Sequence, residues 1–300
     1  MRLTTRLSHA LLGLAVTTGA LTTGTTAAHA MSPTAPAAAT AGTRSPAADA
    51  PAVLSDAAYL IDAKSGKVRF SKEADVRRPV ASITKAMTAY TVLQQAKPTD
   101  KITVTAEDVR YASQGGASVA NLRAGDTLTV EDTLYAMMLP SGADAAHALA
   151  RTYGTGVEAF VAKMNATAHR LGMTNTKYVN ADGMPYNGGG YSTARDQVSL
   201  AKAVLNNTTL KKVTSTRYHS VPSTSEHRAY SWRNTNRLLG TPGALGVKTG
   251  YTRAAGYTLA FAAERGDSLL VGVVLGAPSS SSRFQSAEAL LDWAAAADDR

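Results

Sequence analysis

The 300-residue chain contains no cysteine. This absence excludes disulfide bonds, a thiolate nucleophile, iron–sulfur clusters and thiolate zinc sites. The sequence also lacks the His-Glu-x-x-His spacing of zinc hydrolases, a Gly-x-Ser-x-Gly nucleophile turn, a phosphate-binding glycine loop and any internal repeat. We therefore expect neither a metal nor a cofactor in this protein.

A strong excess of charge of either sign is also missing. The chain has 31 lysines and arginines against 22 aspartates and glutamates, and the resulting net charge of +9 is spread along the sequence. Such a mild and scattered excess does not predict binding to nucleic acid. It fits a surrounding of anionic polymers, and it fits ordinary solubility equally well. The 44% of hydrophobic residues is typical of a folded globular protein.

The N-terminal segment has the three parts of a secretory signal peptide. Arg2 and Arg6 supply positive charge, residues 11–16 form a short apolar run, and Ala28-His29-Ala30 fits a signal-peptidase site. The alternative is an uncleaved anchor, but the run is too short and too rich in Thr and Gly for a stable membrane helix. We therefore expect a secreted, extracytoplasmic protein with no stable membrane anchor. Removal of residues 1–30 leaves a net charge of +7.

The remaining chain divides into a linker and one folded domain. Residues 31–52 are mostly Ala, Pro, Thr and Ser, which indicates a disordered linker, and the fold is expected over residues 53–300. Two β-hairpins are expected, one from strands 57–63 and 68–70 and one from strands 256–264 and 268–276, and short strands are expected at 101–104 and 127–130. One helix is expected to begin near residue 82, and further helices are expected over 131–151, 157–171, 193–205 and 283–297. The segment with His219 and Glu226-His227 is expected to be a polar loop. This order predicts an α+β fold, in which the N-terminal hairpin and the C-terminal strands form one antiparallel sheet flanked by helices and a helical subdomain.

One candidate for the nucleophile is a Ser-x-x-Lys pair, Ser82 and Lys85, at the start of an expected helix. Side chains three residues apart share a helix face, so the lysine can act as the base that removes the serine proton. Burial and a second cation lower the pKa of such a lysine. The same spacing recurs at Ser199 and Lys202, but deep within a helix, where the hydroxyl faces its own backbone and a structural role is expected.

Two further segments distinguish the first pair from the second. Ser141-Gly142-Ala143 follows an apolar run and Pro140, and Lys248-Thr249-Gly250 precedes the C-terminal strands at an expected sheet edge. Ser-x-x-Lys, Ser-Gly-x and Lys-Thr-Gly in this order form the three-motif set of penicillin-interactive serine acyl-transferases. Each motif alone is weak, whereas the ordered set is specific.

With these motifs the sequence resembles the low-molecular-mass D-alanyl-D-alanine carboxypeptidases, which are penicillin-binding serine peptidases of the DD-peptidase and β-lactamase superfamily. The resemblance covers about residues 53–297, and four segments carry it: 80–89, 180–183, 192–196 and 246–257. It implies the DD-peptidase fold. It also implies a substrate class, peptidoglycan stem peptides that end in D-Ala-D-Ala, and covalent inhibition by β-lactam antibiotics.

The resemblance implies a role for each candidate site residue. Ser82 attacks the penultimate D-alanine carbonyl, Lys85 is its base, and Ser141 passes a proton to the leaving amine. Lys248 and Thr249, followed by Gly250, hold the terminal carboxylate of the substrate. The remaining two implied residues are Tyr251, whose backbone N–H forms the oxyanion hole with that of Ser82, and Arg283, near the carboxylate. Two cations suit a free carboxylate, and the charge of Lys248 is expected to lower the pKa of Lys85.

Ala143 departs from the family pattern, because an asparagine usually occupies this third position of the second motif. A methyl group cannot form the hydrogen bonds of that amide, so a weak enzyme is expected. The resemblance leaves open whether this enzyme also catalyses transpeptidation beside hydrolysis. Two alternatives remain: an inactive homologue that only binds penicillin or the cell wall, and a serine β-lactamase. The β-lactamase would need a Glu-x-x-Leu-Asn segment, which is missing here. We also expect that the chain carries no additional C-terminal β-rich domain or terminal amphipathic anchor.

Overall fold

The computed structural model describes residues 50–298. The expected signal peptide, 1–30, and nearly all of the expected linker, 31–52, lie outside the described residues. Among the described helices, none combines the length and the apolar character needed to span a lipid bilayer.

Five antiparallel strands form the main sheet in the order β2-β1-β9-β8-β7. Its strands are β1 (Ala57–Asp62), β2 (Val68–Lys72), β7 (Ala244–Thr252), β8 (Gly256–Arg265) and β9 (Ser268–Ala277). The N-terminal hairpin joins the C-terminal strands through the pairing of β1 with β9. This arrangement confirms the expected sheet and places β7 at its edge.

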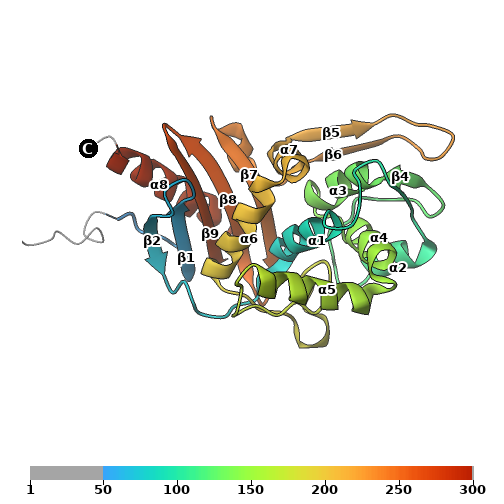
Figure 1. Ribbon diagram of the computed structural model, residues 1–300, viewed down its shortest axis with the longest axis horizontal. Helices are drawn as coiled ribbons and strands as arrows, with labels where there is room; N and C mark the ends of the chain where they lie inside the picture. The colour runs from blue at the N-terminus through green and yellow to red at the C-terminus, as the bar shows by residue number, and fades with distance from the viewer. Residues whose placement is uncertain (1–49, 299–300) are drawn as a thin grey trace, which may run out of the picture. The chain divides into compact units, whose positions relative to one another are not determined.

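Helices cover both faces of the sheet (Figure 1). On one face, α8 (Ser280–Asp298) packs Phe284 and Leu291 against an apolar cluster that includes Leu60 and Phe261. On the other face, α6 (Ala194–Asn206) packs against β1 and β9 and contributes to a second, larger core. The central strands β8 and β9 are buried along most of their length because helices pack on both sides of them, and the expected α+β fold is confirmed.

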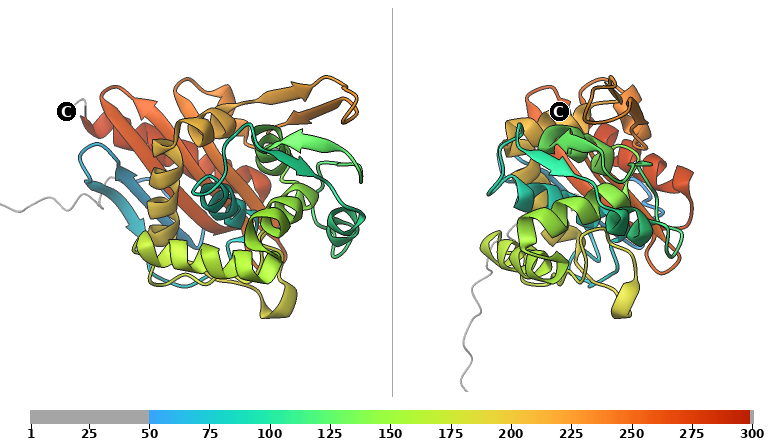
Figure 2. Two further views of the ribbon diagram at one scale, coloured as in Figure 1. Left: turned by 45° about the vertical axis from the view of Figure 1, so that its right-hand side comes forward. Right: turned by 90° about the vertical axis from the view of Figure 1, so that its right-hand side faces the viewer.

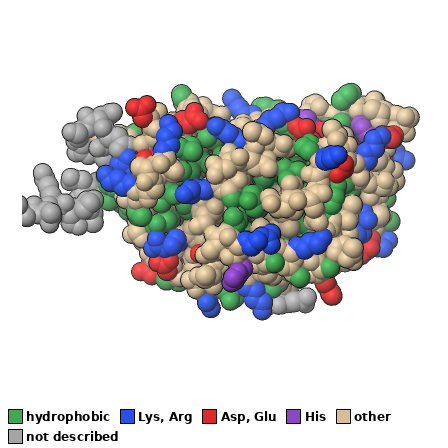
Figure 3. Space-filling view, viewed as in Figure 1, with side chains coloured by type: hydrophobic (Ala, Val, Ile, Leu, Met, Phe, Trp, Pro, Cys, Tyr) green, Lys and Arg blue, Asp and Glu red, His purple; other side chains and the backbone are tan. Residues whose placement is uncertain are grey.

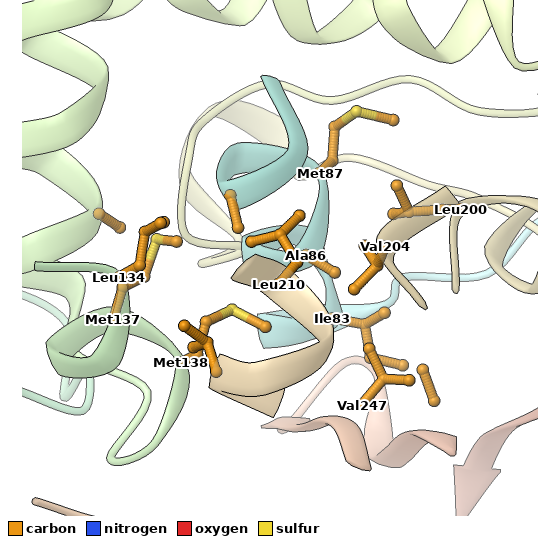
Figure 4. Packing of buried hydrophobic residues seen from close by; sticks show 14 of the residues in the cluster. Ile83, Ala86, Met87, Leu134, Met137, Met138, Leu200, Val204, Leu210 and Val247 are labelled. Carbon is orange, nitrogen blue, oxygen red and sulfur yellow. The ribbon is translucent and has the colours of Figure 1, made fainter. Parts of the chain in front are cut away.

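The helical part lies beyond β7 and is built around α1 (Thr84–Val92). It also contains α2 (Ala106–Ala112), α3 (Val130–Met138), α4 (Ala143–Gly154), α5 (Val157–Arg170) and α7 (Thr208–Ser215). Figure 4 shows Ile83 and the α1 residues Ala86 and Met87 among apolar side chains from α3, α6, α7 and β7. Since α1 is enclosed by other elements, the chain just before it is held in a fixed position.

The expected single helix over residues 131–151 is wrong, because the chain turns between α3 and α4. Pro140 lacks the N–H that a continuing helix needs, and Ser141 has a left-handed φ of 69°. A non-glycine residue rarely adopts that conformation, and it is common at active sites. The break places Ser141 at the turn that leads into α4.

Two small two-stranded antiparallel sheets complete the fold (Figure 2). One pairs β3 (Lys101–Thr103) with β4 (Thr127–Thr129); both strands were expected from the sequence, whereas their pairing was not. The other pairs β5 (Tyr218–Val221) with β6 (Tyr230–Arg233), and this pairing corrects the expected polar loop. His219 lies in β5, stacked at 3.7 Å on Tyr135. Of the three residues expected in a loop, only Glu226 and His227 lie in the segment that connects β5 to β6.

Candidate active site

Ser82 lies in a short 3₁₀ turn, Ala81–Ile83, that leads directly into α1. The turn is held from the sheet, since the Thr258 hydroxyl of β8 donates a 3.0 Å hydrogen bond to the Val80 carbonyl. Lys85, in the first turn of α1, places its Nζ 3.1 Å from the Ser82 Oγ. The structure thus brings the first Ser-x-x-Lys pair into hydrogen-bond contact.

Lys85 is almost completely buried, with 1% of its surface exposed. Burial lowers its pKa from 10.5 to about 8, while the carboxylates of Asp182 and Asp144 act in the opposite direction. The Nζ also donates a 2.8 Å hydrogen bond to the Asp182 backbone carbonyl, which fixes the amine toward Ser82. A lysine in this state can accept a proton close to neutral pH.

The turn over residues 180–183 is built to present the Asp182 carbonyl to Lys85. The Asn180 side chain accepts from the Gly183 N–H at 2.7 Å and donates to the Met184 carbonyl at 2.6 Å. Gly183 has a φ of +84°, and a Cβ there would collide with the Ala81 carbonyl. This close approach explains why a glycine follows Asp182 beside the turn that carries Ser82.

The Ser141 Oγ is buried and has no hydrogen-bond partner among the described residues. Its neighbour Asp144 anchors the loop opposite, because its two carboxylate oxygens accept from the N–H groups of Ala120 and Leu122 at 2.9 Å each. Ala143 is completely buried at the first position of α4. The hydroxyl of Ser141 is therefore available for a ligand in a position that α4 and this loop hold rigid.

The Lys-Thr-Gly segment occupies the edge strand β7, as expected. Lys248 is 1% exposed, and its Nζ donates to the Thr249 carbonyl at 3.1 Å. Its pKa lies well below 10.5 because of burial, with further lowering by the charges of Lys85 and Arg283. Burial is the main cause of the low Lys85 pKa, and the charges of Lys85 and Lys248 disfavour each other.

Gly250 marks a close approach of β7 to Ser82. A Cβ at this position would collide with the Thr258 hydroxyl and lie 2.9 Å from the Ser82 backbone nitrogen. Tyr251 follows with its side chain 54% exposed, and its ring lies 4.3 Å from that of Tyr257. The backbone of β7 at 250–251 thus runs beside the Ser82 N–H.

Arg283, in the first turn of α8, is buried and not a surface arginine. Its Nη1 donates to the Gly250 carbonyl at 2.8 Å and to the Thr258 carbonyl at 3.3 Å. Burial lowers its pKa to about 10, against an opposing effect of Tyr257. Arg283 therefore braces the Lys-Thr-Gly strand and lies close enough to Lys248 to affect its charge.

Thr235 is a site residue that no sequence motif indicated. Its hydroxyl lies 2.6 Å from the Thr249 Oγ1, and its backbone N–H donates to the Leu139 carbonyl at 3.1 Å. It therefore joins β7 to the turn that carries Ser141. No local pattern could have found it, because its partners are 14 and 96 residues away.

The second Ser-x-x-Lys pair has none of this geometry. Ser199 and Lys202 are partly buried on α6, and within residues 50–298 no hydrogen bond joins them. The same described range holds no group of three or more His, Asp or Glu side chains able to hold a metal ion.

A sheet flanked by helices, with a serine–lysine pair facing a Lys-Thr-Gly edge strand, defines the serine DD-peptidase class. Three comparisons agree with it. The family model of the D-alanyl-D-alanine carboxypeptidases matches residues 44–279. A D-alanyl-D-alanine carboxypeptidase of Streptomyces sp. (strain K15) is 38% identical over 256 residues, which are 81% of this chain and 88% of the relative. The crystal structure of the Streptomyces K15 DD-transpeptidase superposes with a TM-score of 0.78 at 36% identity, covering 82% of this chain and 99% of that one.

A further relative, the D-alanyl-D-alanine carboxypeptidase DacC of Escherichia coli (strain K12), is 36% identical over 262 residues. The match covers 82% of this chain but only 62% of that longer protein. This chain belongs to the D-alanyl-D-alanine carboxypeptidase family of serine-type hydrolases.

Proposed function

We propose that this protein removes the terminal D-alanine from peptidoglycan stem peptides through an acyl-enzyme on Ser82. The observation that carries the proposal is the contact between the Ser82 Oγ and the Nζ of a buried Lys85 whose pKa is about 8. An unactivated serine hydroxyl is a poor nucleophile, and a neutral amine within hydrogen-bond reach removes that limitation.

In the acylation step, Lys85 accepts the Ser82 proton while the Oγ attacks the carbonyl carbon of the penultimate D-alanine. The carbon–nitrogen bond to the terminal D-alanine breaks, and Ser141 relays this proton from Lys85 to the departing amine, which leaves Lys85 neutral again. The unpartnered Oγ of Ser141 supports this relay, since it has a hydrogen-bond site free for the leaving group. Water then cleaves the ester, and the Ser82 oxygen regains its hydrogen.

The developing negative charge falls on the carbonyl oxygen, between the backbone N–H groups of Ser82 and Tyr251. Gly250 supports this assignment, because only a residue without a Cβ lets β7 come so close to the Ser82 nitrogen. Fixed backbone donors of this kind stabilise a tetrahedral intermediate without reorganisation.

The substrate carboxylate binds at Lys248 and Thr249, with Arg283 bracing the strand. Burial and two neighbouring cations disfavour the charged form of Lys248 in the free protein. An anionic carboxylate at this place reverses the balance and holds Lys248 protonated. This coupling favours substrates with a free C-terminal carboxylate over those with an amide end.

Penicillin and related β-lactams acylate Ser82 by the same attack and form a long-lived adduct. The Asp182 carboxylate, the nearest candidate for activating a deacylating water, is completely buried. Its burial favours the peptidase over the β-lactamase alternative. The substrate class also implies action outside the cytoplasm, in keeping with the expected signal peptide.

The test is the release of D-alanine from a short N-acylated peptide that ends in D-Ala-D-Ala. We expect Ser82→Ala to lower the rate by at least about 10³-fold, because it removes the nucleophile. Ser199→Ala is the matched control from the second Ser-x-x-Lys pair and keeps the wild-type rate. Equal release by wild type and Ser82→Ala would contradict the proposal.

A further inference from the structure

A groove of about 810 Å³ leads away from the candidate active site along β6, one strand of the β5–β6 hairpin. At the site end it is lined by Pro140, Thr235 and Arg283. Figure 1 shows the hairpin extending from the region of α7 past α3. Along β6 the side chains of Tyr230 and Trp232 are buried, whereas those of Ser231 and Arg233 point outward. The groove therefore has a rigid wall with polar side chains on its open face.

The lining of this groove is basic. Four arginines contribute to it, namely Arg228, Arg233, Arg237 and Arg283, and no aspartate or glutamate does. Within the described chain none of the four forms an ion pair with a carboxylate. On the face drawn in Figure 3, Lys and Arg are scattered among acidic and polar side chains. The groove therefore combines four arginines with a lining that contains no carboxylate.

Aromatic rings hold these guanidinium groups in place. Arg228 lies 5.0 Å above the ring of Tyr230, Arg233 5.6 Å above that of Tyr218, and Arg237 5.9 Å from the ring of Phe284. Stacking limits the conformations of a long side chain, so less entropy is lost when a ligand binds. Planar guanidinium groups recognise carboxylates through paired hydrogen bonds.

The place where the groove begins decides what it can bind. Thr235 contacts the Thr249 hydroxyl, and Arg283 contacts the Gly250 carbonyl. Under the proposed function these residues surround the carboxylate of the departing D-alanine. A simple substrate ends there, so the groove lies beyond the scissile bond, on the leaving-group side. Its occupant is a longer peptide in the place of that D-alanine.

We propose that this groove is a subsite for an amine-bearing peptide with additional carboxylates, which acts as acceptor of the acyl group. The inference rests on the proposed function and extends it to transpeptidation. The acceptor nitrogen attacks the ester carbon on Ser82, a carbon–nitrogen bond forms, and the carbon–oxygen bond to Ser82 breaks. The proton lost by the amine returns to the Ser82 oxygen through Lys85. The reverse sequence cleaves a cross-link whose leaving peptide occupies the groove.

The test measures how the acyl-enzyme divides between water and an acceptor. The donor is an N-acylated peptide ending in D-Ala-D-Ala, and the acceptors are glycyl-D-glutamate and glycyl-D-glutaminamide, in which both carboxylates are amides. The measured quantity is the ratio of transfer product to hydrolysis product, so a change in acylation rate cancels. We expect the wild-type ratio to be about tenfold higher for the dicarboxylate, an advantage that falls with added salt.

The variant Arg233→Gln/Arg237→Gln is expected to lose most of that advantage. The control Lys64→Gln/Arg170→Gln removes two exposed charges outside the groove and is expected to keep the preference for the dicarboxylate acceptor. If wild type hydrolyses the donor, but the arginine variant and the control variant keep the same preference for the dicarboxylate acceptor, the groove inference is wrong and the proposed function stands. If wild type neither hydrolyses the donor nor takes up a β-lactam, both fail. Binding of inorganic polyphosphate that depends on Arg233 and Arg237, without an acceptor preference, would identify the groove as a polyanion site and overturn the inference.

Discussion

The low pKa of Lys85 makes a quantitative prediction for the pH dependence of acylation. Only the neutral amine can accept the Ser82 proton. With a pKa of about 8, roughly one lysine in ten is neutral at pH 7. With an ordinary pKa of 10.5 the fraction would be roughly three in ten thousand. Burial therefore increases the competent fraction about 300-fold, equivalent to about 3 kcal/mol.

The assay is the second-order rate constant for labelling Ser82 with a fluorescent penicillin between about pH 5.5 and 9.5. We expect the rate constant to rise about tenfold per pH unit below pH 7 and to level off above pH 8. The sign follows from the base, since deprotonation of Lys85 creates the reactive form. A flat profile, or a rate constant that still rises tenfold per pH unit up to about pH 9.5, would refute the idea that Lys85 is the buried base.

A substitution near Lys85 tests the cause of the shift. Asp182→Asn keeps the backbone carbonyl that accepts from Lys85 and removes the carboxylate that raises its pKa. We expect the midpoint of the profile to move to lower pH. Asp75→Asn, which removes an exposed carboxylate paired with Arg195, is the control and leaves the midpoint in place. A midpoint that stays fixed or moves upward in Asp182→Asn would contradict the electrostatic reasoning.

Three further predictions concern packing around the site. Gly250→Ala is expected to lower the acylation rate by at least about 10²-fold, because the new Cβ would displace the turn that carries Ser82. In the control Gly240→Ala the new Cβ meets no atom within 4 Å, so the wild-type rate is kept. Equal rates in the two variants would contradict the close approach of β7 to Ser82. Asp108→Ala leaves His147 and Arg151 without their buried carboxylate partner. We expect the free energy of unfolding to fall by about 3 kcal/mol, measured as a fall in Tm of roughly 10 °C, and an unchanged Tm would contradict this expectation. Ala143→Asn supplies the missing amide, so the rate of D-alanine release should rise. Because the position is fully buried, the larger side chain is expected to lower the free energy of unfolding by about 1–3 kcal/mol. Unchanged or slower release would show that Ala143 does not limit turnover.

The sheet and the reactive residues could be predicted because their signals are local. The Ser82–Lys85 contact follows from helix periodicity, and the strands around the Arg265–Asp267 turn follow from β-rich runs on either side of it. The break at Pro140 was visible in the sequence, but apolar residues on both sides made 131–151 look continuous. The left-handed conformation of Ser141 has no local signal, because a residue other than glycine rarely adopts it.

The parts that escaped prediction depend on contacts between distant segments. The carbonyl that fixes the Lys85 amine comes from Asp182, 97 residues away. The β5–β6 hairpin has an eight-residue connection without a tight turn signal, and its pairing relies on Trp232, whose indole N–H donates to the Ala120 carbonyl at 2.9 Å. Sequence order alone does not bring such pairs together, so Thr235 and the arginine groove became visible only in the fold.

The central claim is that Ser82 is the nucleophile, and the mass of the protein after exposure to benzylpenicillin tests it most directly. We expect the intact protein to gain the mass of one penicillin, and peptide mapping to place the adduct on Ser82. The adduct should be lost in Ser82→Ala and kept in Ser199→Ala. No adduct, an adduct on another residue, or rapid catalytic destruction of the antibiotic would contradict the proposed mechanism.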